Sequence, residues 1–260
     1  MTILKFLLLE RALCQRIRPV ATCAIMMAAT IAGQAAAAES GLYNDKVTHK
    51  TGHYQISQPR GVGPEGVLVY FHGSGEGSTY AAHMDLLARL AKPFNLAVVA
   101  LQAPDQQNSW AADLPRTGAV NRLYVHSLLD KVVYGVHPTW SRQRTVFVGF
   151  SAGSTFLSGD FLPDEVDHYH GGAVLLCGGG SPLVPSTQNT ASLNANVRSN
   201  FRLYYVIQTG DFLYAQTTAA MKEWKRRGLN VAGESPVGTG HCGFDVGKAL
   251  ASGLRYVFTP

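Results

Sequence analysis

The 260-residue sequence has no apolar run of membrane-spanning length after its first forty residues, and it has no internal repeat. A transmembrane helix needs about 20 consecutive apolar residues, and a solenoid or propeller needs a repeated unit, so we expect neither architecture. Hydrophobic side chains nevertheless make up 46% of the chain. A chain of this length and composition can bury one substantial core, and we expect a single globular domain.

The first 38 residues have the composition of an export signal. Four basic residues precede an apolar run at residues 20–32, which leads into the small-residue stretch "QAAAAES". This order is typical of a secretory signal peptide, here with cleavage near Ala36 or Ala38. A membrane anchor is the alternative, but the run is rich in Ala and Thr and is shorter than a bilayer requires. We therefore expect residues 39–260 to be a single secreted or periplasmic domain with no stable membrane anchor.

The mature chain also has little net charge. The leader contains one acid, Glu10, and the basic residues Lys5, Arg11, Arg16 and Arg18. Their removal from 17 acidic and 22 basic residues leaves 16 acidic and 18 basic, which is +2 in place of +5. Most of the basicity belongs to the leader, so we expect no nucleic-acid partner.

Cysteine is scarce, and two of the four cysteines lie in the leader. Cys177 and Cys242 remain, and an oxidising compartment favours a disulfide between them. Two buried thiols are the alternative. Two cysteines without a histidine at zinc-ligand spacing do not predict a metal site, and we expect neither a metal nor an organic cofactor.

Buried strands alternate with amphipathic helices along the mature chain. Apolar runs predict strands at residues 66–73, 96–104, 144–150, 171–180, 201–210 and 229–233, after an edge strand at 53–57. Helical spacing predicts helices at residues 78–94, 119–133, 217–228 and 244–257, and another after residue 151. This alternation favours an α/β fold with a doubly wound, mostly parallel sheet. In such sheets ligands bind beyond the carboxyl ends of the strands.

The motif "GFSAGS" stands between a predicted strand and a predicted helix. Its serine, Ser151, has Gly149 two residues before it and Gly153 two residues after it. A sharp turn that lifts the serine out of the sheet crowds both positions, and glycine relieves this crowding because it has no Cβ. We interpret Ser151 as a nucleophile at the positive end of the following helix; a Gly/Ser loop that merely ends a strand is the alternative.

A serine hydroxyl needs a base, and the base needs an acid that orients it. Asp211 follows a buried strand and His241 lies in a Gly-rich loop near the C-terminus, in the order expected after such a serine. Other candidates lie on the nucleophile's helix, before the next strand or too close to His241. These are Asp160, Asp164, Asp167, His168, His170 and Asp245.

The stretch "YFHGSGEGS" closes the first buried strand with small residues. Backbone N–H groups in such a loop can bind the oxyanion of a tetrahedral intermediate. We expect the N–H of Ala152 to act with that of Ser74, and Gly75 is the next candidate. His72 braces this loop by hydrogen bonding in our interpretation, and a catalytic role is the alternative.

Together, "HGSG", "GFSAGS", Asp211 and His241 resemble the α/β-hydrolase fold over nearly the whole mature chain. In its export signal, its compact size and the cysteine that directly follows His241, the chain is similar to secreted esterases related to polyhydroxybutyrate depolymerases and feruloyl esterases. Those relatives often carry a cysteine where this chain has Ser74, and some carry one beside the nucleophile, where it has Phe150. A bridge between Cys177 and Cys242 would tether the histidine loop to the sheet.

These observations predict a secreted serine hydrolase that cleaves carboxylic esters through an acyl-enzyme on Ser151. An acyltransferase with the same triad and a non-catalytic binding protein of this fold are the alternatives. Residues 178–200 are too few for a large cap domain, although this polar loop is a candidate lid, so small-molecule and polymer-borne esters both fit. Trp110 either lines the substrate pocket or packs in the core, and Phe150 packs under the turn.

Overall fold

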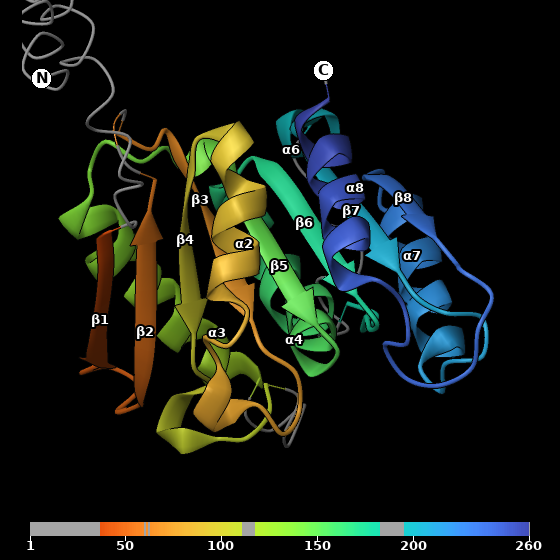
Figure 1. The fold of residues 1–260 in the computed structure, drawn as a ribbon, viewed down its shortest axis with the longest axis horizontal. Helices are drawn as coiled ribbons and strands as arrows, with labels where there is room; N and C mark the ends of the chain where they lie inside the picture. The colour runs from red at the N-terminus through yellow and green to blue at the C-terminus, as the bar shows by residue number, and fades with distance from the viewer. Residues whose placement is uncertain (1–36, 60, 62, 111–117, 183–194, 260) are drawn as a thin grey trace, which may run out of the picture. The chain divides into compact units, whose positions relative to one another are not determined.

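The computed structural model describes residues 37–59, 61, 63–110, 118–182 and 195–259 (Figure 1). Their strands form one eight-stranded sheet in the order β1-β2-β4-β3-β5-β6-β7-β8. The strands are β1 (Ala37–Asn44), β2 (Thr51–Gln58), β3 (Gly66–Phe71), β4 (Leu96–Leu101), β5 (Thr145–Phe150), β6 (Gly171–Leu176), β7 (Phe201–Val206) and β8 (Asn230–Glu234). The pairs β1–β2 and β2–β4 are antiparallel, and all the others are parallel. The predicted mostly parallel sheet is confirmed.

Helices cover both faces of this sheet (Figure 1). On one face lie α2 (Met84–Ala91) and α8 (Val246–Phe258). The other face is covered by α3 (Gly118–Leu128), α4 (Ala152–Phe156), α5 (Leu162–Glu165), α6 (Ala195–Asn200) and α7 (Tyr214–Arg226). Short 3₁₀ turns span Gly77–Thr79, Lys92–Phe94, Pro104–Gln106, Arg142–Arg144 and Val166–His168, and π-helical turns span Leu129–Tyr134 and Leu157–Phe161. No helix in the described part of the chain is long and apolar enough to cross a bilayer.

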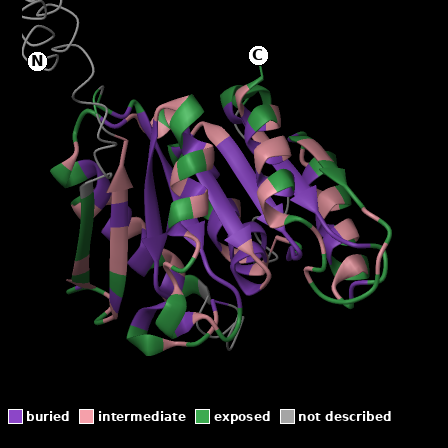
Figure 2. Ribbon diagram, viewed as in Figure 1, coloured by how far each residue is buried: buried purple, intermediate pink, exposed green. Residues whose placement is uncertain are grey.

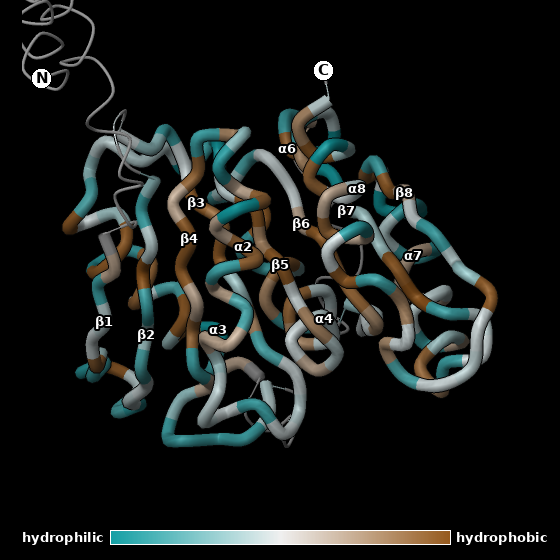
Figure 3. Tube along the Cα trace, in the orientation of Figure 1, coloured by the Kyte–Doolittle hydropathy of each residue, from teal (hydrophilic) through white to brown (hydrophobic). Residues whose placement is uncertain are grey.

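The core has two halves because strand side chains alternate between the faces of the sheet. In β3, Val67, Val69 and Phe71 pack in one cluster, and Leu68 and Tyr70 pack in the other. Figure 2 shows burial concentrated in the central strands, and Figure 3 shows that the same strands are the most hydrophobic part of the fold. Their continuous apolar runs therefore follow from burial on both faces.

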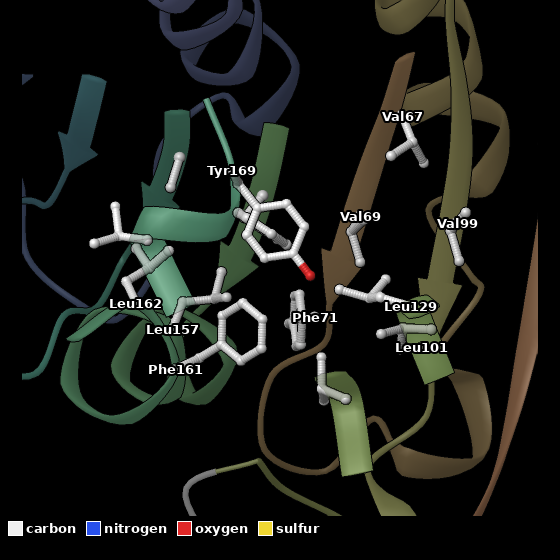
Figure 4. Packing of buried hydrophobic residues seen from close by; sticks show 14 of the residues in the cluster. Val67, Val69, Phe71, Val99, Leu101, Leu129, Leu157, Phe161, Leu162 and Tyr169 are labelled. Atoms are coloured by element: carbon white, nitrogen blue, oxygen red, sulfur yellow. The ribbon is translucent and has the colours of Figure 1, made fainter. Parts of the chain in front are cut away.

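The carboxyl end of β3 packs against the helical segment that follows β5. Phe71 lies close to Phe161 and Leu157 of that segment (Figure 4), and the ring centroids of Phe71 and Phe161 are 6.2 Å apart. Tyr169, just before β6, completes this group, with its ring 6.4 Å from that of Phe161. This packing fixes the position of the helical segment relative to the loop after β3.

Two details differ from the sequence expectation. Residues 53–57 belong to β2, which is an inner strand because β1 pairs along its outer side. The sequence "AAESGLYN" of β1 has no hydrophobic alternation, so backbone pairing rather than side-chain pattern defines this strand. Helix α6 occupies the end of the expected polar loop. Residues 183–194 of the candidate lid, and all but the last two residues of the predicted signal peptide, lie outside the described residues.

The parallel strands β3, β5, β6, β7 and β8 end at the same edge of the sheet. The loops that leave this edge contain the residues expected to act in chemistry. Ser74 follows β3, Ser151 follows β5, Cys177 follows β6, Asp211 follows β7, and His241 follows β8. The topology thus brings together residues that are far apart in the sequence.

Candidate active site

Ser151 lies at a strained turn between β5 and α4. Its φ is 49° and its ψ is −109°, a conformation that non-glycine residues rarely adopt. A Cβ on Gly149 would lie 2.5 Å from the backbone nitrogen of Ser154, and one on Gly153 would lie 2.2 Å from the carbonyl oxygen of Phe71. Both distances are shorter than real contacts, so both positions require glycine. The sharp turn that the motif predicts is present, and it places the Ser151 side chain beyond the end of the sheet.

The structure brings Ser151, His241 and Asp211 together in one hydrogen-bonded chain. The distance from Ser151 Oγ to His241 Nε2 is 2.7 Å. On the other side of the ring, His241 Nδ1 lies 2.9 Å from Asp211 Oδ2 and 3.1 Å from Oδ1. The Asp211 side chain is fully buried, whereas that of His241 is 29% exposed. The base is therefore open to a ligand while the residue that orients it is enclosed.

This arrangement fixes the histidine tautomer. A carboxylate only accepts hydrogen bonds, so Nδ1 carries the proton and donates it to Asp211. Nε2 then has a free lone pair that accepts the hydroxyl proton of Ser151. The N–H of Leu213 also donates to Asp211 Oδ1, at 2.9 Å, and holds the carboxylate in position. The Ser151 hydroxyl thus faces an oriented imidazole nitrogen, as nucleophilic catalysis requires.

His72 braces the loop after β3, as the sequence predicts. It is fully buried. Its Nδ1–H donates to the carbonyl oxygen of Gly73 at 2.7 Å, and its Nε2 accepts the N–H of Ala103 at 3.1 Å. Burial lowers the pKa of this imidazole, and the hydrogen bond to Gly73 opposes the shift. His72 is therefore a neutral structural residue that connects the ends of β3 and β4.

The hydrogen bonds of the same loop distinguish between the candidate oxyanion donors. The N–H of Gly73 donates to Glu76 Oε2 at 2.8 Å, and that of Gly75 donates to the carbonyl oxygen of Asn108, also at 2.8 Å. Gly75 is therefore wrong as an oxyanion donor. The backbone N–H of Ser74 makes no hydrogen bond to any other described residue, and its side-chain hydroxyl pairs with that of Ser109 at 2.8 Å.

Ala152 provides the second candidate donor. It is the first residue of α4, and the first N–H groups of a helix have no partner within the helix. These groups also lie at the positive end of the helix dipole. Of the candidate donors, Ser74 and Ala152 are thus the two whose N–H groups have no backbone partner among the described residues.

A disulfide joins Cys177 to Cys242. Cys177 directly follows β6, and Cys242 directly follows His241, so the bond connects the histidine loop to the centre of the sheet. The two sulfur atoms and a ring nitrogen of His241 lie within 4.8 Å of one another. A metal would need the sulfurs as thiolates, and the bond between them removes that possibility. The predicted disulfide is present.

Gln208 supports the histidine loop in a way that the sequence does not reveal. Its side-chain oxygen accepts the N–H of Gly243 at 3.0 Å, and its side-chain nitrogen donates to the carbonyl oxygen of the same residue at 3.1 Å. The N–H of Gly210 donates to the carbonyl oxygen of Gly238 at 3.0 Å, which joins the loops after β7 and β8. The loops that contain Asp211 and His241 are therefore linked to each other by hydrogen bonds, and the disulfide ties the histidine loop to the end of β6.

Trp110 does not line a substrate pocket. Its side chain is fully buried, with ring centroids 5.0 Å from Phe71 and 5.1 Å from Phe156. The aromatic cluster under the nucleophile's helix encloses it, so the core alternative holds. Phe150 is partly buried and packs with His83 at 6.0 Å, which agrees with a packing role beside the turn. Phe212 is an exposed aromatic residue beside His241, and no motif in the sequence points to it.

Solved structures share this fold. FphF, a fluorophosphonate-binding serine hydrolase of Staphylococcus aureus, superimposes with a TM-score of 0.62 at 16% identity, over 87% of this chain and all of the other. A ferulic acid esterase gives a TM-score of 0.60 at 12% identity, over 86% of this chain and 98% of the other. S-formylglutathione hydrolase of Staphylococcus aureus gives 0.55 at 17% identity, over 87% and 98%.

The sequence comparisons give no corresponding match. No protein-family model matches the chain, and no curated protein matches it. At identities below 20%, the structural likeness establishes the α/β-hydrolase fold. One fold of this kind hosts many activities, so the activity depends on the residues of the site.

Proposed function

We propose that this chain is a secreted serine hydrolase that cleaves carboxylic esters through an acyl-enzyme on Ser151. The observation that carries the proposal is the continuous hydrogen-bonded chain from the Ser151 hydroxyl through His241 to the buried Asp211. The strained backbone of Ser151 supports it, because such strain persists mostly at functional sites. The structural neighbours that are named esterases agree with this reading of the site.

The first half of the reaction forms the acyl-enzyme. Ser151 Oγ attacks the ester carbonyl carbon while His241 Nε2 takes the hydroxyl proton. Asp211 stabilises the imidazolium that forms, and the N–H groups of Ser74 and Ala152 donate to the oxyanion. The imidazolium then gives its proton to the alcohol oxygen as the bond between that oxygen and the carbonyl carbon breaks. The alcohol leaves, and the acyl group remains on Ser151.

The second half repeats these roles with water as the nucleophile. His241 takes a proton from water, the hydroxide attacks the acyl carbon, and the oxyanion again forms beside Ser74 and Ala152. Collapse of this intermediate releases the carboxylic acid and returns the proton to Ser151. All proton transfers pass through one imidazole, so the chemistry requires neither a metal nor an organic cofactor.

A fluorophosphonate probe tests the proposal directly. We expect the native protein to be labelled and Ser151→Ala to remain unlabelled while it stays folded. Hydrolysis of p-nitrophenyl esters of increasing chain length, with one aromatic ester included, then defines the acyl preference. A folded native protein that is neither labelled nor active on any ester would be a non-catalytic protein of this fold. Product analysis with an added alcohol would detect acyl transfer.

Export belongs to the same proposal. The disulfide is compatible with an oxidising compartment. β1 begins at Ala37, so cleavage after residue 36 leaves the edge strand whole, and cleavage after Ala38 removes two of its residues. N-terminal sequencing of the exported protein tests this. A retained leader would contradict the signal-peptide interpretation.

A further inference from the structure

Phe212 is an exposed aromatic residue in direct contact with the proposed base. It follows Asp211 in the sequence, and the residue is 76% exposed. Its ring centroid lies 4.7 Å from that of His241, with 42° between the ring planes. An exposed side chain of this size leaves a large apolar area in contact with water. Such a residue beside a reacting group suggests contact with a ligand.

The backbone around Phe212 is held in place by hydrogen bonds to its neighbour. The N–H of Leu213 donates to the Asp211 side chain at 2.9 Å, and the N–H of Tyr214 donates to the Asp211 carbonyl oxygen at 2.9 Å. The N–H of Asp211 in turn donates to the carbonyl oxygen of Gln208 at 3.1 Å. The ring of Phe212 is therefore carried by the same short turn that positions the acid, and its place beside His241 is fixed by that turn.

The orientation of the ester in the proposed reaction determines which part of it lies next to the Phe212 ring. The carbonyl oxygen of the ester points toward the N–H groups of Ser74 and Ala152. The alcohol oxygen has to lie near His241 Nε2, because the imidazolium protonates it as the bond breaks. A group attached to that oxygen therefore extends past the imidazole, on which Phe212 packs.

We propose that Phe212 contacts the alcohol part of the substrate and favours esters whose alcohol carries an aromatic or similarly apolar group. This inference rests on the proposed ester-cleaving function, and it adds a preference for the alcohol part of the ester, which that function does not specify. Aromatic rings attract one another through apolar burial and through the geometry of their π systems. An alcohol with a ring would cover Phe212, whereas a small alcohol such as ethanol is too short to do so.

Three esters separate the two sides of the substrate. Benzyl acetate has a ring on the alcohol, ethyl phenylacetate has a ring on the acyl group, and ethyl acetate has neither. The ratio of kcat/KM in the variant to that in the native protein is measured for each ester, so intrinsic reactivity cancels. Phe212→Ala removes the ring, and Phe212→Leu keeps an apolar side chain. Val47→Ala is the matched control, since Val47 is also 76% exposed and lies in the turn after β1.

We expect Phe212→Ala to lower kcat/KM for benzyl acetate about tenfold, the order of magnitude of a lost aromatic contact. The values for ethyl acetate and ethyl phenylacetate, and the pH profile with ethyl acetate, should stay as in the native protein. Phe212→Leu should lose less than Phe212→Ala, and Val47→Ala should change nothing.

Three results would overturn the inference without touching the proposed function. An equal loss for all three esters would show that Phe212 only positions His241, and a loss confined to ethyl phenylacetate would place the ring on the acyl side. Unchanged kcat/KM values for all three esters in Phe212→Ala would show that Phe212 does not contact the substrate. A folded native protein that cleaves none of the esters and takes no fluorophosphonate would instead overturn the proposed function, and this inference with it.

Discussion

Replacing Asp211 with asparagine tests the orientation of the base with almost no change in side-chain shape. The Asp211 side chain is fully buried, and it accepts hydrogen bonds from His241 Nδ1, from the N–H of Leu213 at 2.9 Å and from the N–H of Cys242 at 3.4 Å. The N–H of Leu213 lies closer to Oδ1 than the N–H of Cys242 lies to Oδ2, so we expect the asparagine oxygen to take the Oδ1 position. The new NH₂ group then faces Nδ1, which has to accept instead of donate. The imidazole changes tautomer, and Nε2–H points at the Ser151 hydroxyl.

A serine facing Nε2–H has no base to take its proton. We expect kcat/KM for p-nitrophenyl acetate to fall by about 10⁴-fold, as for loss of tautomer control in a serine protease triad. This corresponds to about 5 kcal/mol of transition-state stabilisation. Fluorophosphonate labelling should slow in parallel, while the circular dichroism spectrum stays native because asparagine fills the same volume.

Asp245→Asn is the matched control. Asp245 lies near His241 in the sequence, but its side chain caps α8 by accepting the N–H of Lys248 at 2.9 Å. Asparagine caps helices about as well as aspartate, so activity and stability should stay near native values. A loss of less than about tenfold in Asp211→Asn, which is below 1.4 kcal/mol, would refute the assignment of Asp211. A loss in Asp245→Asn as large as in Asp211→Asn would show that the effect is not specific to the triad.

The remaining predictions concern stability. Gly153→Ala should lower the free energy of unfolding by more than about 4 kcal/mol, because the new Cβ would lie 2.2 Å from a carbonyl oxygen at the end of β3. Gly63→Ala is the control, since a Cβ there meets nothing within 4 Å. Equal urea midpoints for the two variants would contradict this prediction. Reducing the bond between Cys177 and Cys242, which are 65 residues apart, should lower the free energy of unfolding by about 4 kcal/mol through loop entropy, and a midpoint unchanged by reductant would argue against it. Burial lowers the pKa of His72 below its usual 6.5, so the folded state binds fewer protons than the unfolded state, and stability present above pH 6.5 is lost as the pH falls. This loss approaches about 1.4 kcal/mol per pH unit, and an equally steep loss in His72→Gln would exclude His72 as its source.

The parts of the site that follow local rules can be predicted from the sequence. Ser151 stands in a motif whose glycines are required by contacts within a few residues and with the neighbouring strand. Asp211 and His241 follow strands whose order in a parallel sheet is predictable. Chain order and strand ends thus indicate Ser151, Asp211 and His241, and the structure brings these three residues within hydrogen-bonding distance.

The remaining features depend on contacts between distant segments, which local patterns do not encode. Gly75 is excluded as a donor only because Asn108 lies opposite its N–H. Trp110 is enclosed by rings from two other elements, and nothing in its own segment distinguishes a buried tryptophan from an exposed one. Phe212 is the opposite case from Trp110: it is an apolar residue shortly after a buried strand, yet it is exposed. β1 is defined by its backbone pairing with β2, and its small and polar residues form no pattern that predicts a strand.

The disulfide beside His241 couples the completion of this site to the redox state of its surroundings. Without this bond, the hydrogen bonds between Gln208 and Gly243 are among the contacts left to hold the histidine loop. Oxidation therefore adds a covalent anchor to a loop that only non-covalent contacts position in the reduced chain.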